Sequence, residues 1–218
     1  MARADYIGFS DADDMLAYDA FETYYNCAIE KDYDMVISQF YDVYDNGTTI
    51  GNVYSPPLNI ENLIKTSNIS FWNKMIKKSL LLDYGEIPEN TVFDDFPYII
   101  PLISKIDKRK IGYINKPLYY HINRDDSEAG SSQSPKMGDA IIAAEETLKK
   151  VSNEYADSAV YRITKWLLHN IRERWRFSQE FIEYFQKNKL VLIGNRFLRD
   201  DKPAMKRTFE LLDINVTA

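Results

Sequence analysis

The sequence predicts an α/β fold, in which a mixed sheet with flanking helices is followed by a helical C-terminal region. Apolar segments of strand length recur between residues 6 and 121, and segments with helical apolar spacing separate them. From residue 136 onward the apolar spacing is helical. The 218 residues are 45% hydrophobic and 14% aromatic, which is enough for a substantial core and excludes disordered and low-complexity classes. We divide the chain into residues 1–130, which hold the sheet, and residues 131–218, which are helical.

The first strands and helices are predicted as follows. Residues 6–9 form a short apolar run, which favours a strand covered on both faces and hence central in a sheet. Residues 15–30 have helical spacing. Residues 34–44 are predicted as a strand that ends at the turn signal Asp45-Asn46-Gly47, and residues 48–54 as its hairpin partner.

Four more elements are predicted before residue 122. Asn59 is placed to start a short helix that ends at residue 65. Residues 70–82 are predicted as an amphipathic helix with its lysines on the outer face. Residues 93–97 open a helix to residue 106, which Pro101 bends or divides. Residues 110–121 are predicted as one strand, or as two pieces interrupted at Lys116-Pro117.

The C-terminal region is predicted from its apolar spacing. Residues 125–135 are rich in serine, aspartate and glycine, which indicates a surface loop and marks the boundary. The helices predicted beyond it cover residues 137–152, 155–176, 178–188 and 203–212.

Composition excludes several classes of protein. The single cysteine, Cys27, excludes an intrachain disulfide and a cysteine-rich zinc site. Apolar runs stay well short of the roughly 20 residues that a membrane-spanning helix needs, and no signal peptide opens the sequence. We therefore expect a cytoplasmic protein, at most peripheral at the inner face of the membrane.

Charge is unevenly placed within the net charge of −6. Residues 1–135 hold 12 basic and 21 acidic side chains, and residues 136–218 hold 15 and 12. The acidic first part excludes nucleic acid as a partner, because affinity for nucleic acid depends on neutralising phosphates. The mildly basic helical tail suits peripheral contact with an anionic membrane or a partner, although a solvated face is the more common reason for such charge.

The first candidate site is the acidic cluster Asp11, Asp13 and Asp14, directly after the first predicted strand. Ligands of open α/β sheets bind beyond the carboxyl ends of strands. Clustered carboxylates without histidine or cysteine favour a hard ion, magnesium or manganese, bridged to a diphosphate. The alternative is that Asp13 or Asp14 only caps the next helix.

The second candidate is Asp94-Asp95, at the start of a predicted helix. A carboxylate beside a metal site can act as a general base toward a hydroxyl nucleophile, and its neighbour can orient the acceptor. The alternative is an acidic first turn that complements the helix dipole.

A third candidate pair follows the strand that ends at residue 121. His121 is placed to complete a metal site or contact a phosphate, and Arg124 to hold phosphate oxygens. A structural role is the more common one for a histidine at a strand end. His169 lies in an apolar helix and is assigned to packing, and nothing in the sequence around Cys27 indicates an activated thiolate.

The order of these motifs resembles the carboxyl-terminal half of a family 2 glycosyltransferase catalytic domain, which has the GT-A fold. The resemblance covers roughly residues 4–127. Residues 6–16 (YIGFSDADDML) resemble the strand that ends in the Asp-x-Asp motif of the family, and residues 34–37 (DMVI) match a later strand. Residues 71–76 (FWNKMI) resemble an acceptor-side helix, and Phe93-Asp94-Asp95 stands where the family has Glu-Asp. Residues 111–120 (IGYINKPLYY), followed by Arg124 and Ser127, resemble the closing strand and loop.

The resemblance implies a role for each candidate residue. Asp11 and Asp13, with Asp14, would hold Mg²⁺ or Mn²⁺ on the diphosphate of a nucleotide sugar, and Arg124 would meet the same diphosphate. Asp95, with Asp94 beside it, would activate the hydroxyl of a glycan or other acceptor for an inverting transfer of a hexose. Trp72, Asn73 and His121 would line the substrate side.

The sequence departs from the family pattern at its start. In family members a nucleotide-binding half precedes the strand that ends in the Asp-x-Asp motif. Here only residues 1–5 precede it, so we expect a truncated, a naturally split or a degenerate protein, with an α+β fold in the truncated form. Residues 6–10 would then be an exposed sheet edge, which a homo-oligomer or the missing N-terminal half would cover. We expect the isolated chain to transfer sugar weakly or not at all.

Two other classes of function compete with the glycosyltransferase. One is a non-catalytic assembly module, in which residues 136–218 dock to a partner and the acidic motifs are relics. The other is a phosphohydrolase with Asp11 as nucleophile, which would need serine or threonine and lysine motifs that the sequence does not place.

Overall fold

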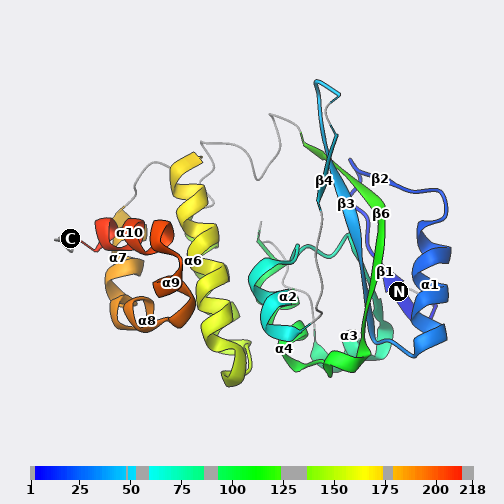
Figure 1. Cartoon of the computed structure of the whole chain (residues 1–218). Coiled ribbons are helices and arrows are strands. Elements are labelled where there is room, and N and C mark those ends of the chain that lie inside the picture. Colours follow the sequence, from blue (N-terminus) through cyan, green and yellow to red (C-terminus); the bar gives the residue numbers. More distant parts are fainter. Residues whose placement is uncertain are drawn as a thin grey trace.

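The computed structural model describes residues 3–47, 49–52, 59–85, 93–123, 137–173 and 179–212. Within these ranges the strands form one mixed sheet of order β1-β5-β3-β6-β2, with β4 paired to β3 (Figure 1). Strands β3 and β6 are parallel, and the other described pairings are antiparallel. The strands are β1 (Tyr6–Gly8), β2 (Met15–Leu16), β3 (Met35–Tyr44), β4 (Thr49–Asn52), β5 (Lys74–Lys77) and β6 (Ile111–Asn123).

The two faces of the sheet belong to two apolar clusters. In β3, Met35 and Ile37 face the larger cluster and Val36 faces the smaller one, as the alternation of side chains along a strand requires. Helix α1 (Ala20–Lys31) covers the smaller cluster and lies on one side of the sheet, whereas α2 (Ile60–Thr66) and α4 (Phe96–Lys105) lie on the other side (Figure 1).

The C-terminal helices extend the larger cluster rather than forming a separate core. Helix α5 (Met137–Lys150) packs on α4, and α6 (Ala156–Glu173) packs on α2. Beyond α6 lie α7 (Gln179–Lys187), α8 (Lys189–Gly194), α9 (Arg196–Asp200) and α10 (Lys202–Leu211) (Figure 1). Buried Ile99, Ala144 and Leu167 belong to one cluster, so the apolar core is continuous from the sheet into the C-terminal helices.

The α/β fold and most of the predicted elements are confirmed. The strand at 34–44 and its hairpin partner are β3 and β4. Asn59 caps α2 by accepting a hydrogen bond from the Asn62 N–H. Residues 111–123 form one strand with an irregularity in register near Pro117. Pro101 lies inside α4, which continues through it. The predicted loop at 125–135 and Arg124 lie outside the described residues.

Three predictions about elements are wrong. Residues 70–82 are not one helix but β5 followed by α3 (Lys78–Tyr84), and Lys74 is buried instead of facing solvent. The helix expected at 15–30 begins only at Ala20, because Met15 and Leu16 pair with Tyr120 and Tyr119 of β6. The first strand is not central: β1 lies at the edge of the described sheet, half-buried, with β5 as its neighbour.

Candidate functional site

The loop after β1 is tied to β6 by Tyr119. The hydroxyl of Tyr119 donates to Asp14 Oδ2 at 2.7 Å and accepts the Asp11 N–H at 3.0 Å. The other carboxylate oxygen of Asp14, Oδ1, accepts the N–H of Ile122 at 2.7 Å. Tyr119 is fully buried, so the acidic loop is held in place by a rigid group. No sequence pattern indicated that a tyrosine would hold this loop.

Asp14 therefore has a structural task. Both of its oxygens accept hydrogen bonds from β6, whereas Asp11 and Asp13 are exposed and accessible to a ligand. The alternative, in which Asp13 or Asp14 caps the next helix, is wrong, because α1 begins at Ala20 with Asp19 at its N-cap.

Asp95 is a partly buried carboxylate at the start of α4. It makes no side-chain capping bond to that helix; instead its Oδ1 accepts the N–H of Phe71 at 3.2 Å. Burial raises the pKa of Asp95 to about 7, the charges of Asp94 and Asp11 add to the rise, and Lys74 opposes it. A carboxyl group with a pKa near neutrality suits proton transfer at physiological pH.

The two acidic segments face a common region. Burial raises the pKa of Asp11, and Asp14, Asp13 and Asp94 raise it further. Burial also raises the pKa of Asp94. Since Asp94 acts on Asp11 and Asp11 acts on Asp95, carboxylates more than 80 residues apart in sequence are brought within electrostatic range. The rings of Phe9 and Phe71 lie 4.8 Å apart, and the Phe71 N–H binds Asp95, so Phe71 links the two segments.

An aromatic stack borders this region. The ring of Trp72 lies on Tyr119 (4.4 Å between centroids, 16° between planes) and on His121 (5.2 Å, 11°). Phe40 meets Trp72 edge-on at 4.7 Å. Trp72 is only 6% exposed, so it holds its neighbours in place and offers little free surface for a substrate.

The side chain of Asn73 is buried and hydrogen-bonded within the protein. It is 2% exposed, its Nδ2 donates to the carbonyl of Ser38 at 3.1 Å, and its Oδ1 accepts from Lys74 at 2.7 Å. These bonds indicate that Asn73 shapes the site through its neighbours rather than by pointing at a ligand.

His121 is oriented by Asp42. The imidazole Nδ1 lies 2.9 Å from Asp42 Oδ1, and this hydrogen bond is the main cause of the raised pKa of His121, with Asp14 and Asp11 adding to it. Asp42 also accepts from Asn123 at 3.2 Å. A carboxylate that fixes one imidazole nitrogen sets the direction of the other. The sequence analysis did not single out Asp42.

The donor set fits a hard cation, although it is not assembled as a complete cage. Within the described ranges no three histidine, cysteine or acidic side chains form a group that could hold a metal. Asp11 nevertheless stands among carboxylates whose mutual repulsion raises its pKa, a repulsion that a divalent cation relieves. Asp11 and Asp13 offer the oxygen ligands that Mg²⁺ and Mn²⁺ prefer.

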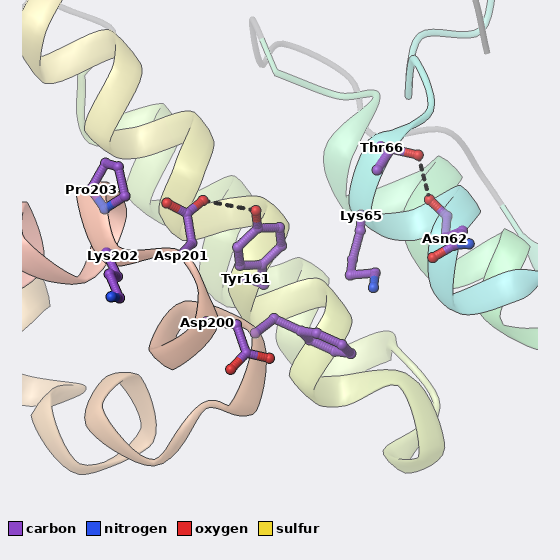
Figure 2. A pocket seen from close by; sticks show the side chains of 9 residues that line it. Asn62, Lys65, Thr66, Tyr161, Asp200, Asp201, Lys202 and Pro203 are labelled. Atoms are coloured by element: carbon purple, nitrogen blue, oxygen red, sulfur yellow. Dashed lines mark hydrogen bonds between the residues drawn. The ribbon is translucent and has the colours of Figure 1, made fainter. Parts of the chain in front are cut away.

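A separate pocket lies between α2, α6 and the α9–α10 turn (Figure 2). It is open, has a volume of about 690 Å³, and none of the acidic candidate residues line it. The hydroxyl of Tyr161 donates to Asp201 at its rim, and Lys65 lies over the ring of Phe197. The lining consists of Asn62, Lys65, Thr66, Tyr161, Phe197, Asp200, Asp201, Lys202 and Pro203.

In the part of the chain that the structure describes, no helix combines the length and the apolar character needed to cross a membrane. His169 is exposed on α6, so the packing role expected for it is wrong. Burial raises the pKa of the Cys27 thiol, which agrees with an unactivated cysteine.

Comparisons with known proteins give one curated relative and a set of solved structures, whereas no family model matches the chain. The relative is the cholesterol galactosyltransferase of Borreliella burgdorferi, 24% identical over 168 residues, which are 68% of this chain and 46% of that protein. The structures are of S. aureus TarS. Residues 1–349 of TarS align with a TM-score of 0.54 and 16% identity over 97% of this chain and 56% of that one.

The same TarS region has been solved in complex with UDP-GlcNAc (TM-score 0.50) and with UDP (TM-score 0.51). The chain spans about half the length of the proteins that it matches. These likenesses agree with the resemblance stated from the motifs: the chain has a GT-A-like α/β fold and is similar in sequence to part of a galactosyltransferase.

Proposed function

We propose that the chain is the metal and acceptor side of an inverting glycosyltransferase that moves a hexose from a nucleoside diphosphate sugar to a hydroxyl group of a glycan or another acceptor. The observation that carries this proposal is the convergence of the two acidic segments: the ring of Phe9 packs on Phe71, whose N–H binds Asp95, while Asp94 raises the pKa of Asp11 and Asp11 raises that of Asp95. The relative named for galactosyl transfer and the UDP complexes of TarS support a nucleotide sugar as donor.

Asp95 has the environment of a general base. It is partly buried, its pKa is raised to about 7, and the Phe71 N–H holds one of its oxygens. In the proposed reaction the acceptor hydroxyl gives its proton to Asp95 while its oxygen bonds to the anomeric carbon of the sugar. The bond from that carbon to the diphosphate breaks, and the nucleoside diphosphate leaves with the bonding electrons.

Asp11 and Asp13 are the residues proposed to hold the divalent cation. When bound, Mg²⁺ or Mn²⁺ supplies positive charge for the diphosphate leaving group. The Asp11 N–H donates to Tyr119, so the backbone at this residue is positioned before any ligand arrives. His121, directed by Asp42 and protonated more readily than usual, is proposed to meet phosphate oxygens, and Arg124 to meet them from the following loop.

Isothermal titration calorimetry with MnCl₂ and UDP tests the proposal. We expect UDP to bind only with the metal, and Asp13→Ala to weaken binding at least tenfold. Asp45→Ala is the matched control, because Asp45 is exposed on the β3–β4 turn, and it should bind as the unsubstituted chain does. The absence of metal-dependent UDP binding, both by the chain alone and by the chain joined to a nucleotide-binding half, would overturn the proposal.

We propose that a nucleotide-binding half covers the outer side of β1 and one face of α1. Strand β1 is the edge of the described sheet. On α1, Phe21, Tyr25 and Ile29 are each about half exposed (48%, 47% and 51%), and they share a face at helical spacing.

Light scattering after gel filtration tests where this surface binds. We expect the isolated chain to be monomeric, and to bind a nucleotide-binding half more weakly when Tyr25→Lys and Ile29→Lys are combined. A dimer that the double variant separates would instead assign the surface to a second copy.

A further inference from the structure

A buried lysine lies beside the proposed base. Lys74 is 1% exposed, and among the described residues its ammonium forms no ion pair. It donates instead to three neutral oxygens: the carbonyl of Asn68 at 2.7 Å, the carbonyl of Ser70 at 2.6 Å and Oδ1 of Asn73 at 2.7 Å. An ammonium group has three donors, so all of them are satisfied.

The three acceptors belong to one short segment. Residues 68–73 lead into β5, and the ammonium draws the start, middle and end of this turn toward one point. The turn is closed further by the Ser70 N–H, which donates to Asn68 Oδ1 at 2.7 Å, and by the Lys74 N–H, which donates to the Phe71 carbonyl at 3.1 Å. The Lys74 ammonium is thus the shared hydrogen-bond donor at the centre of the turn.

The turn carries two contacts of the candidate site. Its Phe71 N–H donates to Asp95, and its Trp72 ring lies in the stack with Tyr119 and His121. Tyr119 in turn holds Asp11 and Asp14. Lys74 is therefore connected to both acidic segments. The Phe71 N–H leads to Asp95, and the Trp72 ring leads through Tyr119 to Asp11 and Asp14.

A structural role alone explains the buried charge poorly. Removing an ammonium from water is costly, and an apolar side chain of similar length would fill the same volume without this cost. Only a compact group with three donors can satisfy the three oxygens together, and Lys74 also acts electrostatically on Asp95.

We propose that Lys74 is a positioning residue of the site: its ammonium closes the 68–73 turn, and the turn fixes the Phe71 amide on Asp95 and Trp72 in the aromatic stack. This inference rests on the proposed function only in naming Asp95 as the base. The contacts themselves are independent of donor, acceptor and metal.

The test compares Lys74→Met with Lys77→Met. Both lysines are in β5, but Lys77 pairs with Asp32 and Asp34 near the surface. The ¹⁵N-labelled Phe71 amide is followed by NMR from pH 5 to pH 9, and the aromatic stack by near-ultraviolet circular dichroism. Burial also lowers the pKa of Lys74 to about 7, so in the unsubstituted chain we expect the Phe71 amide shift to report the titration of Asp95 and Lys74 together. The part that is lost in Asp95→Asn belongs to Asp95. In Lys74→Met that part should vanish or move upward by about one pH unit or more, and the near-ultraviolet signal should fall, while Lys77→Met keeps both.

A merely structural role gives a different result. If Lys74→Met unfolds at lower urea concentration but keeps the Phe71 titration and the near-ultraviolet signal of the unsubstituted chain, the inference is overturned. If Lys74→Met does not fold, Asn73→Ala provides the test, because it removes one of the three acceptors; a smaller change in the same two signals supports the inference, and unchanged signals overturn it. Failure of the calorimetric test of UDP binding would overturn the proposed function. The Phe71 titration and the near-ultraviolet signal would still test the role of Lys74.

Discussion

Two groups of charged residues lie at opposite ends of β5 and differ in how their charges are stabilised. Around Lys74 and Asp95 the charges are buried or partly buried and are held mostly by neutral hydrogen-bond partners. Around Lys77, the partners Asp32 and Asp34 form ion pairs, and Lys110 also pairs with Asp32; the side chains of Lys77, Asp32 and Lys110 are 34%, 68% and 37% exposed. The surface group has more ion pairs, yet water screens them, so the buried group is expected to matter more for stability and for the site.

The largest effect on stability is expected for Lys74→Met. The variant leaves two buried carbonyls and the Asn73 side chain without their donor and removes the positive charge near Asp95. We expect a loss of about 3–5 kcal/mol in the free energy of unfolding, measured by urea titration at pH 7. A loss below about 1 kcal/mol would mean that the buried group contributes no more than the surface group.

The next effect is a pH dependence that belongs to Asp95. Its pKa is raised to about 7 in the folded chain, against about 3.9 in an unfolded one, so between these values the folded state binds more protons. The free energy of unfolding should therefore fall as pH rises from about 4 to about 7, and this contribution should be constant above.

Asp95→Asn removes that slope, because the amide does not ionise but can still accept the Phe71 N–H. Relative to the unsubstituted chain, the variant should gain about 2–4 kcal/mol between pH 4 and pH 8 in urea titrations. Parallel curves for the two proteins would show that Asp95 is not the titrating group.

A smaller effect is expected for Tyr119→Phe. The variant removes the hydroxyl that joins Asp14 to the backbone of Asp11, at a cost of about 1–2 kcal/mol in unfolding free energy. It should also weaken metal-dependent UDP binding in calorimetry, because the acidic loop is released. Tyr120→Phe is the control, since the ring of Tyr120 packs on Tyr41 and should change neither quantity appreciably. Equal effects in both variants would contradict the assignment.

The smallest effect is expected for Lys77→Met. Its pairs with Asp32 and Asp34 are partly exposed, so the loss should stay below about 1 kcal/mol and shrink further in 0.5 M NaCl. A loss that equals that of Lys74→Met and resists salt would remove the distinction between the two groups.

Local rules predicted the parts of the fold that depend on neighbours in sequence. The turn at Asp45-Asn46-Gly47, the cap at Asn59 and the start of α4 after Asp95 each follow from residue types with defined backbone preferences. The roles that place Asp11, Asp94 and Asp95 in one site came from the family resemblance and not from spacing, and they stay predictions.

The errors came from residues whose partners are distant in sequence. Lys74 was placed on the outer face of a helix because a lysine is rarely buried, and only the folded turn supplies its three acceptors. Met15 and Leu16 continue a helical pattern in sequence, yet they pair with β6 about 100 residues later. Asp42 and Tyr119 were missed for the same reason, since their roles exist only toward His121 and Asp14. The roles assigned to the candidate residues stay predictions.

Helix α6 forms a wall of the Asp94-Asp95 turn. The indole of Trp166 lies 4.9 Å from the ring of Phe93 and 4.3 Å from that of Phe96, on the two sides of the acidic pair, and Arg162 stands one helical turn earlier. A chimera that took its last helices from another protein would therefore also give this turn a new lining. Exchange of the C-terminal segment would then change the surroundings of the proposed base as well as the helices themselves.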